Sequence, residues 1–189
     1  MVNMHDPRVL RTQQLIHEAF RELLRMKGFD AISIKDIAHK ATINRATFYA
    51  HYEDKYALLE ATTEQAFREM IPEQVRNARE FTAEICDQLI LLTHGYIVEF
   101  YQKCRMDSKT FATLVDNKVR EMLQQLIENI YSRADHHGKD RQHITILSAI
   151  TSSAIYGAAH DWLTVGDNHR IDTLIDIVRP YVMKGLGLV

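Results

Sequence analysis

The hydrophobic pattern of this chain divides it into helical segments separated by short polar breaks. In the segment 82–105, for example, apolar side chains recur every three or four residues from Ile85 to Phe100, which is the spacing of one face of a helix. Outside 33–54, the expected helices cover about 8–27, 55–70, 82–105, 108–134, 141–165 and 170–184. Breaks are expected at 76–80, 116–117, 135–140 and 166–168. Only 7 Gly and 3 Pro interrupt the chain, and regular β alternation is hard to find, so the pattern predicts an all-α protein.

The segment 33–59, SIKDIAHKATINRATFYAHYEDKYALL, has the pattern of two short helices joined by a tight turn. Ser33 can cap the first helix, and Asp36 three residues later completes a capping-box arrangement. Asn44 is a good cap for a second helix that we expect to run from Arg45 to about Tyr52. The segment therefore predicts a helix-turn-helix unit.

The second of these helices has an apolar side and a polar side. Phe48 and Tyr52 are four residues apart and can pack inward together. The positions left toward solvent are Arg45, Thr47, Tyr49 and His51. A cation, a hydroxyl, a phenol and an imidazole on one face can donate hydrogen bonds to phosphates and base edges, which suits a DNA groove.

The first third of the chain resembles the DNA-binding domain of the tetracycline-repressor (TetR) family of bacterial transcription regulators. The residues that carry the resemblance are Arg11, Ile16, Ala19, Phe20, Leu24, Gly28, Phe29, Ile34, Asp36, Ile37, Ala38, Ala41, Ile43, Asn44, Arg45, Thr47, Phe48, Tyr49, His51, Tyr52, Lys55, Leu58 and Leu59. Three positions depart from the family pattern. Thr42 stands where the family usually has Gly, although a β-branched residue resists positive φ. Asn44 stands where the family often has Ser or Thr, and Ala46 stands where Gly is common.

The resemblance implies a three-helix DNA-binding domain over 1–55 and an all-helical effector-binding and dimerisation domain over 56–189. It implies a homodimer that binds a double-stranded operator, more commonly as a repressor than as an activator. The expected DNA contacts are Ser33, Lys35, Asn44, Arg45, Thr47, Tyr49, His51 and Lys55. Lys55 has a further physical reason, because it opens a helix whose free N–H groups already favour a phosphate.

The second part of the chain carries aromatic residues and one stretch of small residues. The aromatic side chains expected to contact a mostly apolar small-molecule effector are Tyr96, Phe100, Tyr101, Phe111 and Trp162. Small residues recur between Ala149 and Ala158, and the helix over 170–184 has a broad apolar face. By the resemblance, these last two helices are expected to form the dimer interface.

Charge and cysteine usage change this picture little. The net charge is −2, but residues 1–55 hold nine Lys or Arg against seven Asp or Glu, which leaves +2 there and −4 in the remainder. A mildly basic first domain fits nucleic-acid binding. Cys86 and Cys104 fit a reducing compartment, no secretory signal pattern is visible, and the uncharged stretch 144–159 is too short to span a bilayer. We therefore expect a cytoplasmic protein that does not enter the membrane.

Other classes of function have weaker support in the sequence. His136, His137 and His143 form the densest histidine group, but adjacent turn histidines diverge and no Cys or carboxylate pattern completes a metal site. His160–Asp161 and Ser152–Ser153 lack a Gly-rich oxyanion loop or nucleophile elbow. We expect no metal, no cofactor and no enzyme activity. A DNA-binding module controlled by a protein partner, without a ligand, stays an alternative, and no motif identifies an effector, an operator or regulated genes.

Overall fold

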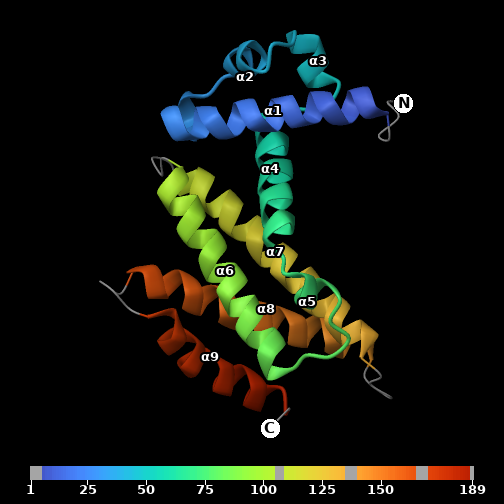
Figure 1. The fold of residues 1–189 in the computed structure, drawn as a ribbon, viewed down its shortest axis with the longest axis vertical. Helices are drawn as coiled ribbons and strands as arrows, with labels where there is room; N and C mark the ends of the chain where they lie inside the picture. Colours follow the sequence, from blue (N-terminus) through green and yellow to red (C-terminus); the bar gives the residue numbers. More distant parts are fainter. Residues whose placement is uncertain (1–5, 105–108, 135–139, 165–169, 188–189) are drawn as a thin grey trace. The chain divides into compact units, whose positions relative to one another are not determined.

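The computed structural model describes residues 6–104, 109–134, 140–164 and 170–187, and these residues form helices without a strand (Figure 1). In chain order the helices are α1 (Pro7–Met26), the 3-10 helix η1 (Phe29–Ala31), α2 (Ile34–Lys40), α3 (Arg45–Tyr49), α4 (Lys55–Met70), α5 (Glu73–Arg76), α6 (Ala83–Lys103), α7 (Lys109–Arg133), α8 (Arg141–Thr164) and α9 (Ile171–Gly185). The all-α class expected from the hydrophobic pattern is confirmed.

The chain forms two compact units. The N-terminal unit comprises residues 1–66 and 100–118, and the C-terminal unit comprises 67–99 and 119–189. The division therefore falls within α4, α6 and α7. The boundary at residue 55 was set by a sequence motif rather than by packing, and it stays a prediction.

Helix α1 supplies one long side of the core of the N-terminal unit. It begins after Asp6, whose carboxylate accepts a hydrogen bond from the Arg8 amide at 2.8 Å, and Pro7 suits the first helical position because no N–H is needed there. Helix α2 packs on α1, and α3 packs on α2 (Figure 1). The largest side chains sealed in this unit are Ile16, Phe20, Phe29, Ile37, Phe48, Leu58, Leu59 and Phe111.

The turn between α2 and α3 closes with two backbone hydrogen bonds. The Ile43 amide donates to the Ala38 carbonyl at 2.9 Å and the Thr42 amide donates to the His39 carbonyl at 3.2 Å. This is the Schellman pattern, which requires a residue in the left-handed region. Thr42 takes that conformation with a φ of 56°. The departure from glycine therefore leaves the turn geometry in place, at a cost in backbone strain.

Helices α6 to α9 build most of the C-terminal unit. Helix α6 begins after Thr82, whose hydroxyl accepts a hydrogen bond from the Ile85 amide at 3.3 Å, as its sequence position predicted. Helices α8 and α9 pack against each other (Figure 1). The guanidinium of Arg179 lies 2.7 Å from the carboxylate of Asp87, and this ion pair ties α9 to α6.

An apolar surface stays uncovered on the last two helices, and we call it the α8–α9 face. The large exposed apolar residues on these helices are Ile146, Ile150, Leu163, Ile177 and Tyr181. A groove of about 330 Å³ runs between the helices, lined among others by Ile150, Ala154, Ala158, Ile177 and Tyr181. A Cβ atom added at Gly157 would meet no atom within 4 Å, so space is open beside it.

Several expected boundaries differ from the observed ones. The recognition helix was expected to reach about Tyr52, but regular α-helix ends at Tyr49, and turns continue the chain with the His51 and Tyr52 amides both bonded to the Phe48 carbonyl at 2.9 Å. Helix α7 is continuous through 116–117, where a break was expected. Helix α5 was not expected, and the buried side chain of Val75 explains why this short turn forms.

Three sequence expectations fall outside the described residues, namely the start of a helix at 107–108 and the turns at 135–139 and 166–168. Among the described helices, none combines the length and the hydropathy that a membrane span needs.

Candidate nucleic-acid interface

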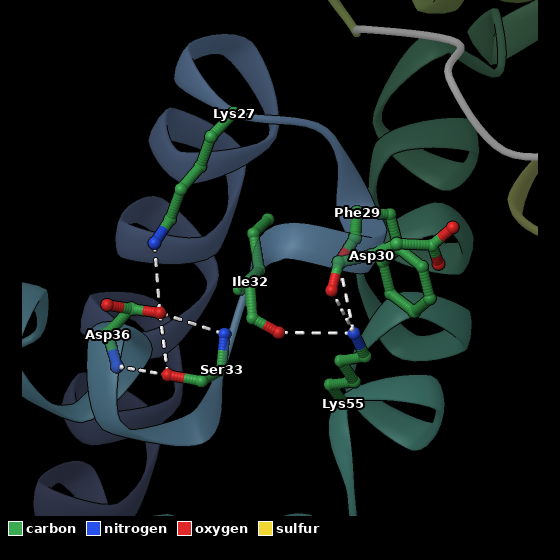
Figure 2. Close-up of polar contacts among 7 residues, drawn as sticks. All are labelled: Lys27, Phe29, Asp30, Ile32, Ser33, Asp36 and Lys55. Carbon is green, nitrogen blue, oxygen red and sulfur yellow. Dashed lines mark hydrogen bonds and ion pairs between the residues drawn. The ribbon is translucent and has the colours of Figure 1, made fainter.

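Helix α2 begins with the capping box that the sequence predicted. The Ser33 hydroxyl accepts a hydrogen bond from the Asp36 amide at 3.2 Å, while the Asp36 carboxylate accepts from the Ser33 amide at 2.9 Å and from the Ser33 hydroxyl at 2.6 Å. The Lys27 ammonium lies 2.9 Å from the same carboxylate (Figure 2). The Ser33 hydroxyl bond, followed by the Lys27 bond, holds the pKa of Asp36 well below its usual range. The start of α2 is thus fixed by local polar contacts.

Helix α3 begins with an equally local cap. The side-chain oxygen of Asn44 accepts from the Thr47 amide at 2.7 Å and from the Thr47 hydroxyl at 3.0 Å. This cap satisfies an N–H group that a five-residue helix cannot satisfy itself. Asn44 and Thr47, both expected to contact DNA, therefore also hold each other in place.

Further expected contacts lie on α2, on α3 and in the turn that follows α3. Lys35, Arg45 and Tyr49 are exposed, and 55% of the Tyr49 surface faces solvent. His51 is half-buried, and burial lowers its pKa. A neutral imidazole offers one hydrogen-bond donor and one acceptor and carries no positive charge. The structure thus brings a lysine, an arginine, a phenol and an imidazole onto elements that share one packed unit.

The inner side of α3 is anchored by aromatic packing and by a buried histidine. Phe48 is fully buried, and its ring packs against Tyr52 at 5.9 Å between centroids. The Tyr52 hydroxyl lies 2.8 Å from Nε2 of His17 on α1, and Nδ1 of His17 lies 2.7 Å from the Thr62 hydroxyl on α4. Sequence reasoning missed His17, although its place on the apolar side of α1 beside Ile16 could have indicated a buried polar link.

Lys55 has partners within the protein. Its ammonium lies 3.0 Å from the Phe29 carbonyl, 3.3 Å from the Asp30 carbonyl and 3.1 Å from the Ile32 carbonyl (Figure 2). The helix that it opens is capped by Asp54, whose carboxylate accepts from the Tyr56 and Ala57 amides at 2.8 Å. The phosphate contact expected of Lys55 stays a prediction, and in this structure the ammonium is directed at the backbone between α1 and α2.

The expected effector contacts belong to both units. In the N-terminal unit, Phe111 is fully buried and its ring lies 5.2 Å from Phe29 and 5.3 Å from Phe100, measured between centroids. In the C-terminal unit, Tyr96 is buried and packs on Phe67 at 5.5 Å, and Trp162 is half-buried. The Tyr101 side chain lies outside the described residues. Their role as ligand contacts stays a prediction.

The residues weighed for metal binding or catalysis show ordinary contacts where they are described. In the described part of the chain, no group of three or more His, Cys, Asp or Glu side chains could hold a metal ion; His136 and His137 lie outside it. His160 Nδ1 is 3.3 Å from the carboxylate of the neighbouring Asp161, and the Ser152 hydroxyl donates to the Ala149 carbonyl at 3.1 Å.

Two capped helices joined by a tight turn, with a polar outer side and a sealed inner side, define a helix-turn-helix DNA-binding protein. Residues 16–62 match the model of the bacterial regulatory proteins of the tetR family, and the solved structures similar to the whole chain include TetR-family regulators. Residues 16–62 thus carry the DNA-binding domain of the TetR family of transcription regulators.

Similar proteins extend this likeness along the chain. The HTH-type dhaKLM operon transcriptional activator DhaS of Lactococcus lactis is 29% identical over 154 residues, which cover 76% of this chain and 79% of that protein. The TetR-family regulator SCO0857 of Streptomyces coelicolor has a TM-score of 0.60 at 18% identity, covering 95% of this chain and 97% of that one. The transcriptional regulator FadR of Bacillus subtilis, solved with stearoyl-CoA, has a TM-score of 0.53 at 16% identity, covering 91% and 98%.

Proposed function

We propose that this regulator is a homodimeric repressor that binds an operator through α2 and α3 and releases it when an apolar small molecule binds. The observation that carries the proposal is the orientation of α3, which buries Phe48 completely and leaves Arg45 and Tyr49 exposed. The proposed DNA contacts are Ser33, Lys35, Asn44, Arg45, Thr47, Tyr49 and His51. Ser33 and Lys35 would act at the start of α2, where backbone N–H groups favour a phosphate.

The α8–α9 face supports the dimer. Ile150 is 61% exposed and Tyr181 is 80% exposed. A contiguous patch of exposed apolar side chains marks an interaction surface, whereas single exposed apolar side chains are common on any protein. The small residues Ala154 and Ala158 line the groove between the helices, so another helix could approach closely. Two copies meeting there would form a symmetric interface in which the same residues occur twice.

The effector is supported more weakly than the operator. Phe100, Phe111 and Tyr96 are aromatic but pack against other aromatic rings, so they also fit a plain core. The FadR structure contains stearoyl-CoA, which favours a ligand with a long apolar chain. A second candidate function is transcriptional activation, because the DhaS relative is an activator by name. Control by a protein partner without a ligand is the remaining alternative.

DNA selection tests the operator proposal. Fragments of the source genome that the purified protein retains should share a pseudo-palindromic site whose half-sites are separated by about one helical turn or a multiple of it. Arg45→Ala should lower affinity for the selected site by roughly 5- to 150-fold, which corresponds to about 1–3 kcal/mol for a good base contact, and should lower affinity for random DNA much less. Arg141, exposed at the start of α8, provides the matched control, since Arg141→Ala should change neither affinity.

A reporter gene under the selected site separates the regulatory alternatives. Loss of the protein should raise expression if it represses and lower expression if it activates. Stearoyl-CoA is the first molecule to test for release of the protein from the operator. A coupling free energy of about 1–3 kcal/mol between effector binding and DNA binding would change operator affinity roughly 5- to 150-fold. If neither it nor shorter acyl-CoA molecules change operator affinity, the acyl-CoA form of the ligand proposal is wrong.

A further inference from the structure

The Lys55 ammonium is bonded to the backbone of its own protein. An ammonium has three N–H donors, and three backbone carbonyls lie within hydrogen-bond distance of Nζ, those of Phe29, Asp30 and Ile32. Nζ also lies 4.5 Å from the centre of the Phe29 ring, which adds a cation–π attraction. With all three donors directed at carbonyl oxygens, the ammonium has none to give to a phosphate unless it leaves them.

These carbonyls belong to the segment that leads from α1 into α2. Phe29 and Asp30 lie in η1, and Ile32 immediately precedes Ser33, the N-cap residue of α2. The Phe29 carbonyl also accepts a hydrogen bond from the Ile32 amide at 3.1 Å, and a carbonyl oxygen has two lone pairs and can accept from a second donor. Lys55 brings the carbonyls of Phe29, Asp30 and Ile32 together on one ammonium, so it links the start of α4 to the segment that precedes α2. Figure 2 shows two lysines at this corner, with Lys27 bound to Asp36 and Lys55 bound to the carbonyls.

The segment held by Lys55 is also held from inside the N-terminal unit. The Phe29 ring is fully buried and stacks on Phe111 at 5.2 Å with an interplanar angle of 16°. Tyr56, next to Lys55 on α4, contacts the same ring edge to face at 5.2 Å between centroids. Phe29 is thus held through its ring, and its carbonyl is bonded to the Lys55 ammonium as well as to the Ile32 amide.

We propose that Lys55 is a positioning residue, which holds the entrance to α2 in the orientation that DNA binding requires and does not itself contact a phosphate. The proposal rests on the proposed operator binding by α2 and α3. Loss of Lys55 would remove the three bonds between the start of α4 and the segment before α2, and α2 and α3 pack on each other. The recognition surface would lose its fixed geometry, although Arg45 and Lys35 would keep their charges.

Salt dependence distinguishes positioning from phosphate contact. Lys35 offers a matched control, because it is an exposed lysine in the first turn of α2. Lys35→Met should lower affinity for selected and random DNA by similar factors, and should flatten the slope of log affinity against log salt by about 0.9 per protomer. Lys55→Met should lower affinity for the selected site by roughly tenfold, the equivalent of losing a charged hydrogen-bond group, with little change for random DNA and no change in slope.

A second variant separates shape from charge. Lys55→Arg keeps the positive charge, so a phosphate contact would survive, but a planar guanidinium does not match three carbonyls converging on one nitrogen. It should therefore lose selected-site affinity as Lys55→Met does. Hydrogen exchange on the DNA-free proteins gives an independent readout. Amides over 29–36 should exchange faster in Lys55→Met than in the unmodified protein, and should be unchanged in Lys35→Met.

A flattened salt slope for Lys55→Met, full selected-site affinity in Lys55→Arg, or unchanged exchange over 29–36 in Lys55→Met would overturn the proposal while operator binding by the unmodified protein stands. Failure of the unmodified protein to retain any genomic fragment would overturn operator binding, and the proposal with it.

Discussion

The hydroxyl of Tyr52, just beyond α3, lies 2.8 Å from Nε2 of His17 on α1, in the interior of the N-terminal unit. The rings meet edge to face at 5.7 Å between centroids. Burial raises the pKa of Tyr52 to about 12, so the hydroxyl keeps its proton at neutral pH. His17 is also bonded to Thr62 on α4 through Nδ1. One imidazole therefore joins the end of the recognition segment to the two helices that support it.

Tyr52→Phe should destabilise the protein, because it removes a hydroxyl and leaves Nε2 of buried His17 without that partner. The expected loss in the free energy of unfolding is about 1–3 kcal/mol, measured by urea denaturation. Tyr49→Phe is the matched control, since the Tyr49 side chain is mostly exposed, and it should leave stability unchanged. Equal stability of the two variants would show that the Tyr52–His17 bond contributes nothing.

Thr42→Gly should stabilise the protein. Thr42 has a φ of 56° and is exposed, so the substitution removes left-handed strain of about 1–2 kcal/mol and little packing. The greater conformational freedom of glycine in the unfolded chain offsets roughly 0.5–1 kcal/mol of this, which leaves a net gain in stability of up to about 1.5 kcal/mol. Thr113→Gly, at an exposed position inside α7, should instead lower the melting temperature. A lower melting temperature for Thr42→Gly would contradict the strain argument.

Asp36→Asn should reveal a pH-dependent contribution to stability. The pKa of Asp36 is lowered in the folded protein by Ser33 and Lys27, and the unfolded value is about 3.9. A carboxylate whose pKa is lower in the folded state stabilises the protein at pH values above its unfolded pKa. That stabilisation is lost as the pH falls from the unfolded pKa through the folded pKa. The variant should thus be less stable than the unmodified protein at pH 7, with a smaller difference at pH 3. A gap of the same size at both pH values would refute this linkage.

Gly157→Trp should dissociate the proposed dimer. A single copy has open space beside Gly157, so a large side chain there clashes only if a second copy covers the α8–α9 face. Light scattering should show a dimer for the unmodified protein and a monomer for the variant, with weaker operator binding. Gln125→Trp, at an exposed position on α7, should stay dimeric. A monomeric unmodified protein at micromolar concentration would rule out the proposed assembly.

The features that the sequence predicted are those whose partners are close along the chain. Ser33 with Asp36 and Asn44 with Thr47 interact within three residues, so cap chemistry identified them. The helix periods likewise identified the all-α class. Lys55 and His17 could not be assigned in this way, because their partners lie 23 to 26 and 35 to 45 residues away. Whether a side chain is free to reach DNA or is bonded within the protein depends on packing between residues far apart in the sequence.

The N-terminal unit is built from two stretches of sequence, 1–66 and 100–118. Phe111 from the second stretch stacks on Phe29 from the first. A recombinant of two related regulators should therefore take both stretches of the N-terminal unit from the same parent. A chimaera joined at residue 55 would pair Phe29 with a foreign first turn of α7, whereas one that transfers both stretches would keep the native pair. Exchange of operator specificity between relatives should be tolerated best when the residue that stacks on Phe29 is transferred together with residues 1–66.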